Sequence, residues 1–147
     1  MGTVRIIESY SSNNDIVFMY GSKSHLNLLE SQTAINEMAL KTHLLLFPVR
    51  RGKFERSTSS RTESGSFFFV IPDNFDRHYF NERNQPVETS KYALKIEPLV
   101  IQLKALEIYL DSCGGIDVVN LESVEAIDVL DANLTGFYVT FNFKVYE

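Results

Sequence analysis

The alternation of apolar and polar positions near the end of the chain predicts its clearest strand. One face of this predicted strand carries Phe137, Val139, Phe141, Phe143 and Val145. Because successive side chains of a strand point to opposite faces, the period of two predicts one buried and one exposed face. Val124–Leu130 is expected to be its hairpin partner. The alternation changes phase within that segment, which is typical of a bulge or of a strand covered on both faces.

Three earlier segments predict further strands, namely Asp15–Tyr20, Thr42–Val49 and Ser66–Ile71. The last two are apolar at consecutive positions, which is typical of strands covered on both faces. Pro48 lacks an N–H group and marks a strand end or an edge position. Residues 50–66 are rich in Ser, Thr and Arg and have neither a helical nor a strand period. They predict a long mobile hairpin arm or loop.

Two segments have helical spacing. The first begins near Ser24 and either breaks near Gln32 or continues to about Leu40. The second, Lys91–Ser112, is the clearer one, and its apolar residues recur every three to four positions. This predicted buried stripe consists of Ile96, Leu99, Val100, Leu103, Leu106 and Leu110. Pro98 predicts a kink, or a regular helix that begins near Glu97.

The order of these elements is β-α-β-β-α-β-β. It predicts an α+β fold in which two helices pack on a mixed or mostly antiparallel sheet of about four to five strands. Residues 1–14 are expected to form an N-terminal arm, and residues 15–147 a single α+β domain. The 147 residues suffice for one domain with a real core.

Cys113 is the single cysteine, so an internal disulfide and a four-thiolate zinc site are excluded. The chain therefore suits a reducing compartment. No apolar run reaches the length of a membrane span, and we expect no membrane partner.

No recognised motif for catalysis, cofactor binding or metal binding occurs in the sequence. The histidines His25, His43 and His78 lie at no metal-ligand spacing. Phosphate-binding glycine motifs are absent. An acidic run comprises Asp117, Glu122, Glu125 and Asp128. Such residues can hold a metal or act as an acid–base pair, but their strand setting without a nearby histidine favours a solvated face. We therefore expect no enzyme activity, no cofactor and a function that depends on surfaces.

The charge distribution supplies candidate surfaces. The net charge of −5 argues against a general nucleic-acid binder. Five basic residues nevertheless lie close together around the aromatic residue Phe54, namely Arg50, Arg51, Lys53, Arg56 and Arg61. In residues 97–147, by contrast, most of the charged residues are acidic. Three interpretations remain open at this point: a solvated loop beside an acidic surface, a contact between the basic loop of one copy and the acidic face of the next, or the lining of a DNA channel.

The order of several segments resembles small phage and prophage proteins of Bacteroidetes-type genomes. The segments that carry this resemblance are Phe18–Gly21, Ser24–Gln32, Leu44–Val49, Phe67–Ile71, Asn81–Asn84, Ile96–Leu99 with Leu103 and Leu106, and Gly136–Val145. These proteins are similar in element order to the tail-terminator and tail-completion proteins of tailed bacteriophages. The resemblance covers most of the chain after residue 14.

The resemblance implies a virion structural protein at the head–tail joint, with homo-oligomeric subunits in a ring that is typically hexameric. Its partners would be the tail tube and the neck or connector proteins, with genomic DNA passing through the lumen. Its location would be the virion, and the host bacterial cytoplasm during assembly. The family supplies no catalytic residues. The alternatives are a head-completion or connector ring protein, or a small binding or regulatory domain that uses the basic loop 50–61.

Overall fold

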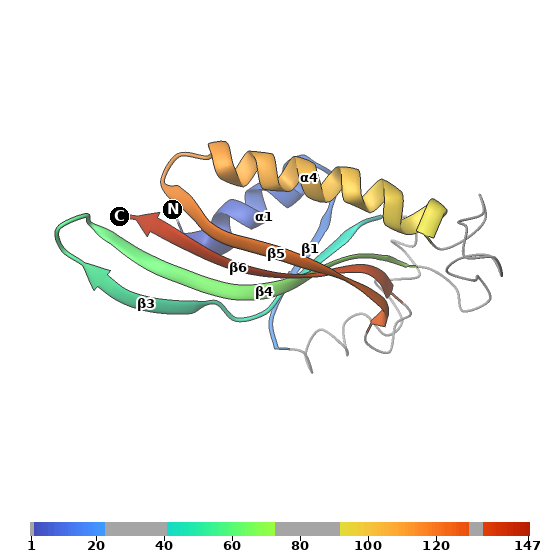
Figure 1. Ribbon diagram of the computed structural model, residues 1–147, viewed down its shortest axis with the longest axis horizontal. Coiled ribbons are helices and arrows are strands. Elements are labelled where there is room, and N and C mark those ends of the chain that lie inside the picture. The colour runs from blue at the N-terminus through green and yellow to red at the C-terminus, as the bar shows by residue number, and fades with distance from the viewer. Residues whose placement is uncertain (1, 23–40, 73–91, 130–133) are drawn as a thin grey trace.

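Helices α1 (Thr3–Asn13) and α4 (Glu97–Ser112) lie on one face of a mostly antiparallel sheet that is not closed into a barrel (Figure 1). The computed structural model describes residues 2–22, 41–72, 92–129 and 134–147, and only the backbone of residues 127–129. The predicted α+β class is confirmed. The described sheet has six strands, more than the four to five expected.

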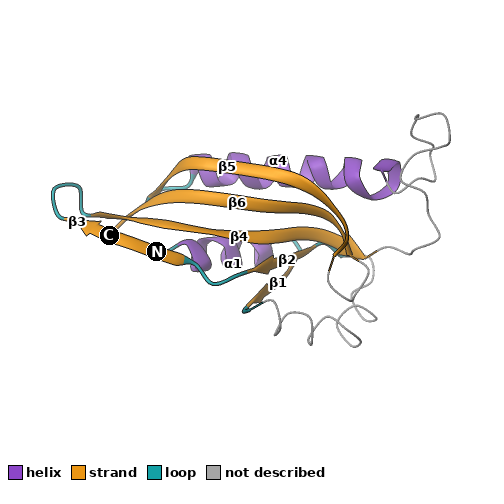
Figure 2. Cartoon of the chain, turned by 60° about the horizontal axis from the view of Figure 1, so that its bottom comes forward, coloured by secondary structure: helices purple, strands orange, loops and turns teal. Residues whose placement is uncertain are grey.

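The strands are β1 (Val17–Tyr20), β2 (His43–Leu46), β3 (Arg50–Glu55), β4 (Ser60–Pro72), β5 (Ile116–Val129) and β6 (Leu134–Tyr146). Their order across the sheet is β1-β2-β4-β6-β5, and β3 pairs with the first half of β4. The β1–β2 pair is parallel, and the other pairs are antiparallel. Figure 2 shows β5 and β3 along opposite sides of the sheet.

Strands β2 and β3 are two parts of one interrupted strand beside β4. The N–H of Phe47 still donates to the carbonyl of Ser66 at 3.1 Å, but Pro48 has no N–H to continue the ladder. Pairing with β4 then resumes in β3. Residues 50–66, expected as a hairpin arm or loop, therefore form a β-hairpin. Its turn includes Ser59, which has a positive φ of 49°.

The main core lies between the two helices and the sheet. Its fully buried members include Ile7, Leu44, Leu46, Phe67, Phe69, Leu99, Leu106, Leu110, Val139 and Phe143. The alternation predicted for the last strand is confirmed, because its apolar side chains are buried on this face. A smaller cluster on the other face contains Leu45, Val70 and Leu134. Strand β2 is thus covered on both faces, as its consecutive leucines predict.

The N-terminal segment differs from the prediction. Instead of an arm, residues Thr3–Asn13 form helix α1, and Ile6, Ile7 and Tyr10 are buried in the main core. The sequence signal was weak because this helix is only three turns long and carries several serines, which are poor residues for helix interiors. Packing against the sheet stabilises it instead.

The second predicted helix is present, and it is regular from Glu97. Residues Tyr92–Ile96 form a π-helical turn, and Pro98 lies directly after it in the first turn of α4, where its fixed φ suits the start of a regular helix. Within the predicted stripe, Val100 is 45% exposed and does not belong to the core. The helix predicted to begin near Ser24 lies outside the described residues.

Strand β5 begins at Ile116, eight residues before the start predicted at Val124. The structure has a bulge between Val118 and Asn120. The extra residue there, Val119, shifts the apolar positions from one face to the other, which hides the strand period.

Candidate functional site

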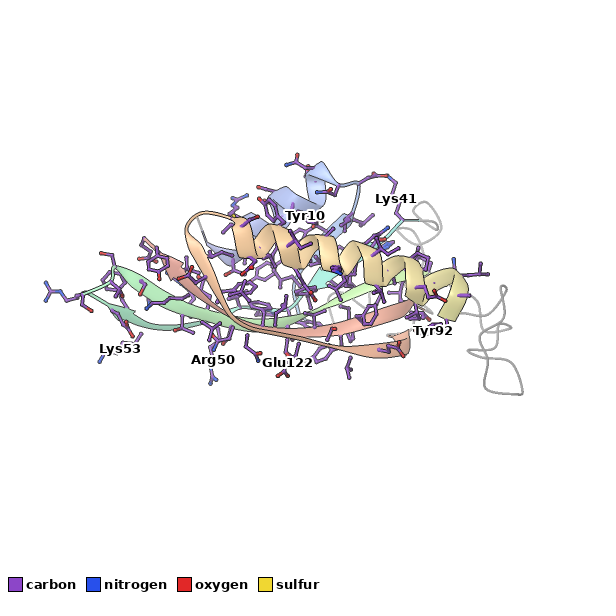
Figure 3. All side chains as sticks on the ribbon, turned by 45° about the horizontal axis from the view of Figure 1, so that its top comes forward. Tyr10, Lys41, Arg50, Lys53, Tyr92 and Glu122 are labelled. Carbon is purple, nitrogen blue, oxygen red and sulfur yellow. The ribbon has the colours of Figure 1, made fainter. Side chains whose placement is uncertain are left out.

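The β3–β4 hairpin concentrates positive charge at one end of the molecule. We call residues 50–61 the basic hairpin. Among the described residues, Arg50, Lys53 and Arg56 are exposed and have no ion-pair partner. Figure 3 shows Lys53 at the end of the molecule and Arg50 pointing away from the helices. These three predicted surface residues are therefore available to a partner.

Two other predicted residues of this group are bound within the chain. Arg51 lies 3.5 Å from Glu63 and 3.3 Å from Glu147, measured between side-chain nitrogen and oxygen. Arg61 donates a 2.7 Å hydrogen bond to the carbonyl of Gly52. These contacts tie both side chains to groups of the same chain and help to hold the hairpin together.

Phe54 lies on β3 among these basic residues. Its ring is 36% exposed, and the guanidinium carbon of Arg61 lies 5.7 Å from the ring centroid. A cation at this distance is attracted by the face of an aromatic ring. The contact favours this position of the ring and leaves part of the ring open to solvent.

The predicted acidic residues lie on β5, at the opposite edge of the sheet. Asp117 accepts a 2.7 Å hydrogen bond from the hydroxyl of Tyr146, and this bond raises the pKa of Tyr146 above its ordinary value. Glu122 and Glu125 are exposed. Figure 3 shows Glu122 pointing away from the helices. The side chain of Asp128 lies outside the described residues.

A groove between α4 and β5 was not predicted from the sequence. It has a volume of about 360 Å³ and is lined by Glu107, Ile108, Asp111, Val118, Val119, Asn120 and Leu121. A second hollow of about 230 Å³ lies farther along α4 and β5, is also lined by Phe137 of β6, and shares Glu107 with the first. We call the first of these the α4–β5 groove. Two large apolar residues that line it, Ile108 and Val119, are 61% and 62% exposed. The signal in the sequence is that Ile108 is apolar although it lies outside the predicted buried stripe of its helix.

The register of the sheet relates the basic hairpin to the groove. Phe54 pairs with Arg61, Arg61 with Val145, and Val145 with Ile116. Phe54 and the start of β5 therefore lie at the two ends of one row across the sheet. The structure places the predicted basic and acidic residues at opposite edges of the sheet, not in one site.

Among the residues that the structure describes, other signs of a catalytic or metal-binding site are weak. No group of three or more His, Cys, Asp or Glu side chains there could hold a metal ion. Burial lowers the pKa of His43, and burial is also the main cause that raises the pKa of Tyr109, next to the half-buried Cys113. No described helix has the length and apolar character needed to cross a bilayer.

Comparison with known proteins adds no family to this description. The sequence matches no protein-family model, and no curated protein is significantly similar to it.

Proposed function

We propose that this chain is a virion structural protein at the head–tail joint of a tailed phage, a tail terminator whose copies form a ring that caps the tail tube and docks to the neck. The observation that carries the proposal is the pair of unlike sheet edges. One edge presents the basic hairpin, and the other presents β5 with exposed acidic side chains. The resemblance of the sequence to tail-terminator proteins supplies the phage context.

Unlike edges favour a head-to-tail contact. Two different patches on one subunit form a heterologous interface, which gives a closed ring when the rotation between neighbours closes. Opposite charges on the two patches bring neighbours together in the correct order and disfavour contacts between like edges. The proposed ring therefore uses both charged surfaces.

The position and direction of the two edge strands support such a contact. β3 and the first part of β5 lie at the same height along the sheet, because Arg51 and Val118 belong to one row through Glu63 and Phe143. Three successive antiparallel pairings separate β3 from β5, so the two strands run in opposite directions. A rotation about an axis along the strands would therefore bring β3 of one copy antiparallel to β5 of the next.

The helix-free face of the sheet suits the lumen of such a ring. At its centre it carries uncharged polar side chains, among them Thr62, Ser64, Ser66, Thr140 and Asn142. Arg50 and Glu122, which also point away from the helices, flank this uncharged centre. The centre itself would make few of the Lys and Arg contacts to phosphate on which tight binding to DNA depends. With this face inward, the helices would lie on the outside.

The test is electron microscopy of the purified full chain combined with its native mass. We expect rings of a single size, and labelled antibody against the chain should mark the joint between head and tail in virions. A protein that stays monomeric at high concentration and is absent from virions would overturn the proposal. Rings located inside the neck, away from the tube end, would assign the chain to the head-completion or connector class instead.

A further inference from the structure

We infer that the basic hairpin of one copy docks on the α4–β5 groove of the next copy, with Phe54 as the apolar anchor. This inference rests on the head-to-tail ring of the proposed function and names the contact within it. The proposed occupant of the groove is therefore a second copy of this chain.

The chemistry of the groove fits this occupant. Apolar side chains of Ile108, Val118 and Leu121 line it, and the exposed Val119 extends that apolar surface to the sheet edge. Glu107 and Asp111 also line it, and neither has an ion-pair partner among the described residues. An apolar floor with free carboxylates beside it suits an aromatic ring flanked by cations.

The hairpin presents such a group. Phe54 is partly exposed. Lys53 precedes it and Arg56 follows it by two residues, and both are exposed and have no ion-pair partner among the described residues. Arg61 contacts one face of the ring, as described above, and this contact restricts the ring before it binds. Aromatic residues that enter a preformed pocket supply much of the energy of many interfaces.

The contact cannot form within one chain, because Phe54 and the start of β5 are separated by the full width of β4 and β6. Both edge strands also have a bulge in this region, between Arg51 and Phe54 in β3 and between Val118 and Asn120 in β5. Bulges at sheet edges interrupt regular strand pairing. Side chains, and not a continuous ladder of backbone hydrogen bonds, would therefore make the contact.

Substitution at both sides of the contact tests the inference in the full chain. Phe54→Ser is expected to weaken association about thirty-fold, measured by sedimentation over a range of concentrations. Ile101→Ser is the matched control: Ile101 is 72% exposed on α4 but does not line the groove. The control should assemble like the native chain. Circular dichroism of each variant reports on retention of the fold.

A charge exchange gives the second arm. Lys53→Glu with Arg56→Glu should weaken assembly, as should Glu107→Lys with Asp111→Lys, whereas all four changes in one chain should restore it. If neither Phe54→Ser nor either charge reversal changed the rings, the groove contact would be wrong although the ring itself would stand. A loss of affinity for duplex DNA in the hairpin variants would not alter that conclusion. A native chain that forms no assembly at any concentration would overturn the ring itself and this contact with it.

Discussion

The backbone N–H of Thr3 donates a hydrogen bond of 2.8 Å to Oε1 of Glu63, so a carboxylate on strand β4 caps the first turn of helix α1. The first N–H groups of a helix have no partner within the helix, and its N-terminus attracts negative charge. Glu63 is 8% exposed, and its other oxygen lies 3.5 Å from Arg51. One buried carboxylate thus joins the N-terminal helix to the base of the basic hairpin.

Glu63→Ala should lower the free energy of unfolding by about 1–2 kcal/mol, because it removes the acceptor for Thr3 and leaves Arg51 with one partner fewer. Urea denaturation measures this change. Glu55→Ala is the control, since Glu55 is exposed and its contacts are long: 4.0 Å to the ammonium of Lys144 and 3.3 Å to the hydroxyl of Thr58. The control should change stability by less than about 0.5 kcal/mol. Equal effects of the two substitutions would contradict the capping role.

Helix α1 should be an integral part of the core. Ile7 has no exposed surface, and we expect Ile7→Ala to cost about 2–5 kcal/mol through the lost apolar contacts and the cavity that remains. Ser9→Ala, on the exposed side of the same helix, should change stability little. Thermal and urea unfolding of both variants provide the measurement. If the N-terminal residues were a loose arm, neither substitution would change the free energy of unfolding.

Gly136 permits a close approach within the core. A Cβ atom added there would overlap the carbonyl oxygen of Phe69 and would lie 3.0 Å from a methyl carbon of Leu99. Because the nearest atom belongs to the backbone, it cannot move aside easily. We expect Gly136→Ala to destabilise the fold by about 1–3 kcal/mol or more.

Gly114 provides the comparison for that substitution, since an added Cβ there would meet no atom within 4 Å. Gly114→Ala should therefore leave the midpoint of urea unfolding nearly unchanged. A similar loss of stability in both alanine variants would show that close packing at Gly136 is not the cause.

The sequence predicted the elements that carry an uninterrupted period. Phe137–Val145 alternates without a break, and the α-helix begins at Glu97, where Pro98 places it. The prediction was less accurate where packing or a local irregularity determines the structure. The bulge at Val119 hid the first half of β5, and strand β3 of the polar hairpin lacks a period because neither of its faces is buried. Long-range contacts such as Thr3 with Glu63 cannot be inferred from residue spacing.

The candidate site was predicted only in part. Arg50, Lys53 and Arg56 are exposed, as expected of a basic surface, but Arg51 and Arg61 bind carboxylates of the same chain or a backbone carbonyl. The α4–β5 groove depends on how a helix lies over an edge strand. Its lining residues come from two segments that only the tertiary fold brings together.

His43 should make the stability of the chain depend on pH. Its side chain is buried, and burial lowers its pKa, although a hydrogen bond with the carbonyl of Lys41 acts in the opposite direction. As the pH falls below the ordinary value of about 6.5, the unfolded chain binds the proton before the folded chain does. The free energy of unfolding should therefore fall as the pH decreases through this range.

Urea unfolding between pH 7.5 and pH 5 tests this expectation, with His43→Gln as the comparison. Both proteins retain His25 and His78, so the difference between their slopes reports on His43 alone. The native chain should lose stability more steeply than the variant. Parallel curves would assign the pH dependence to other groups.

A mixing experiment distinguishes head-to-tail association from two-fold pairing. Phe54→Asp should block the hairpin and leave the groove intact, whereas Val119→Asp should block the groove and leave the hairpin intact. Each variant alone should be monomeric by native mass spectrometry. Mixed together, they should form a one-to-one heterodimer that does not grow, because only one intact hairpin and one intact groove can meet. No heterodimer in the mixture, or a stable homodimer of either variant, would contradict assembly through these two unlike edges.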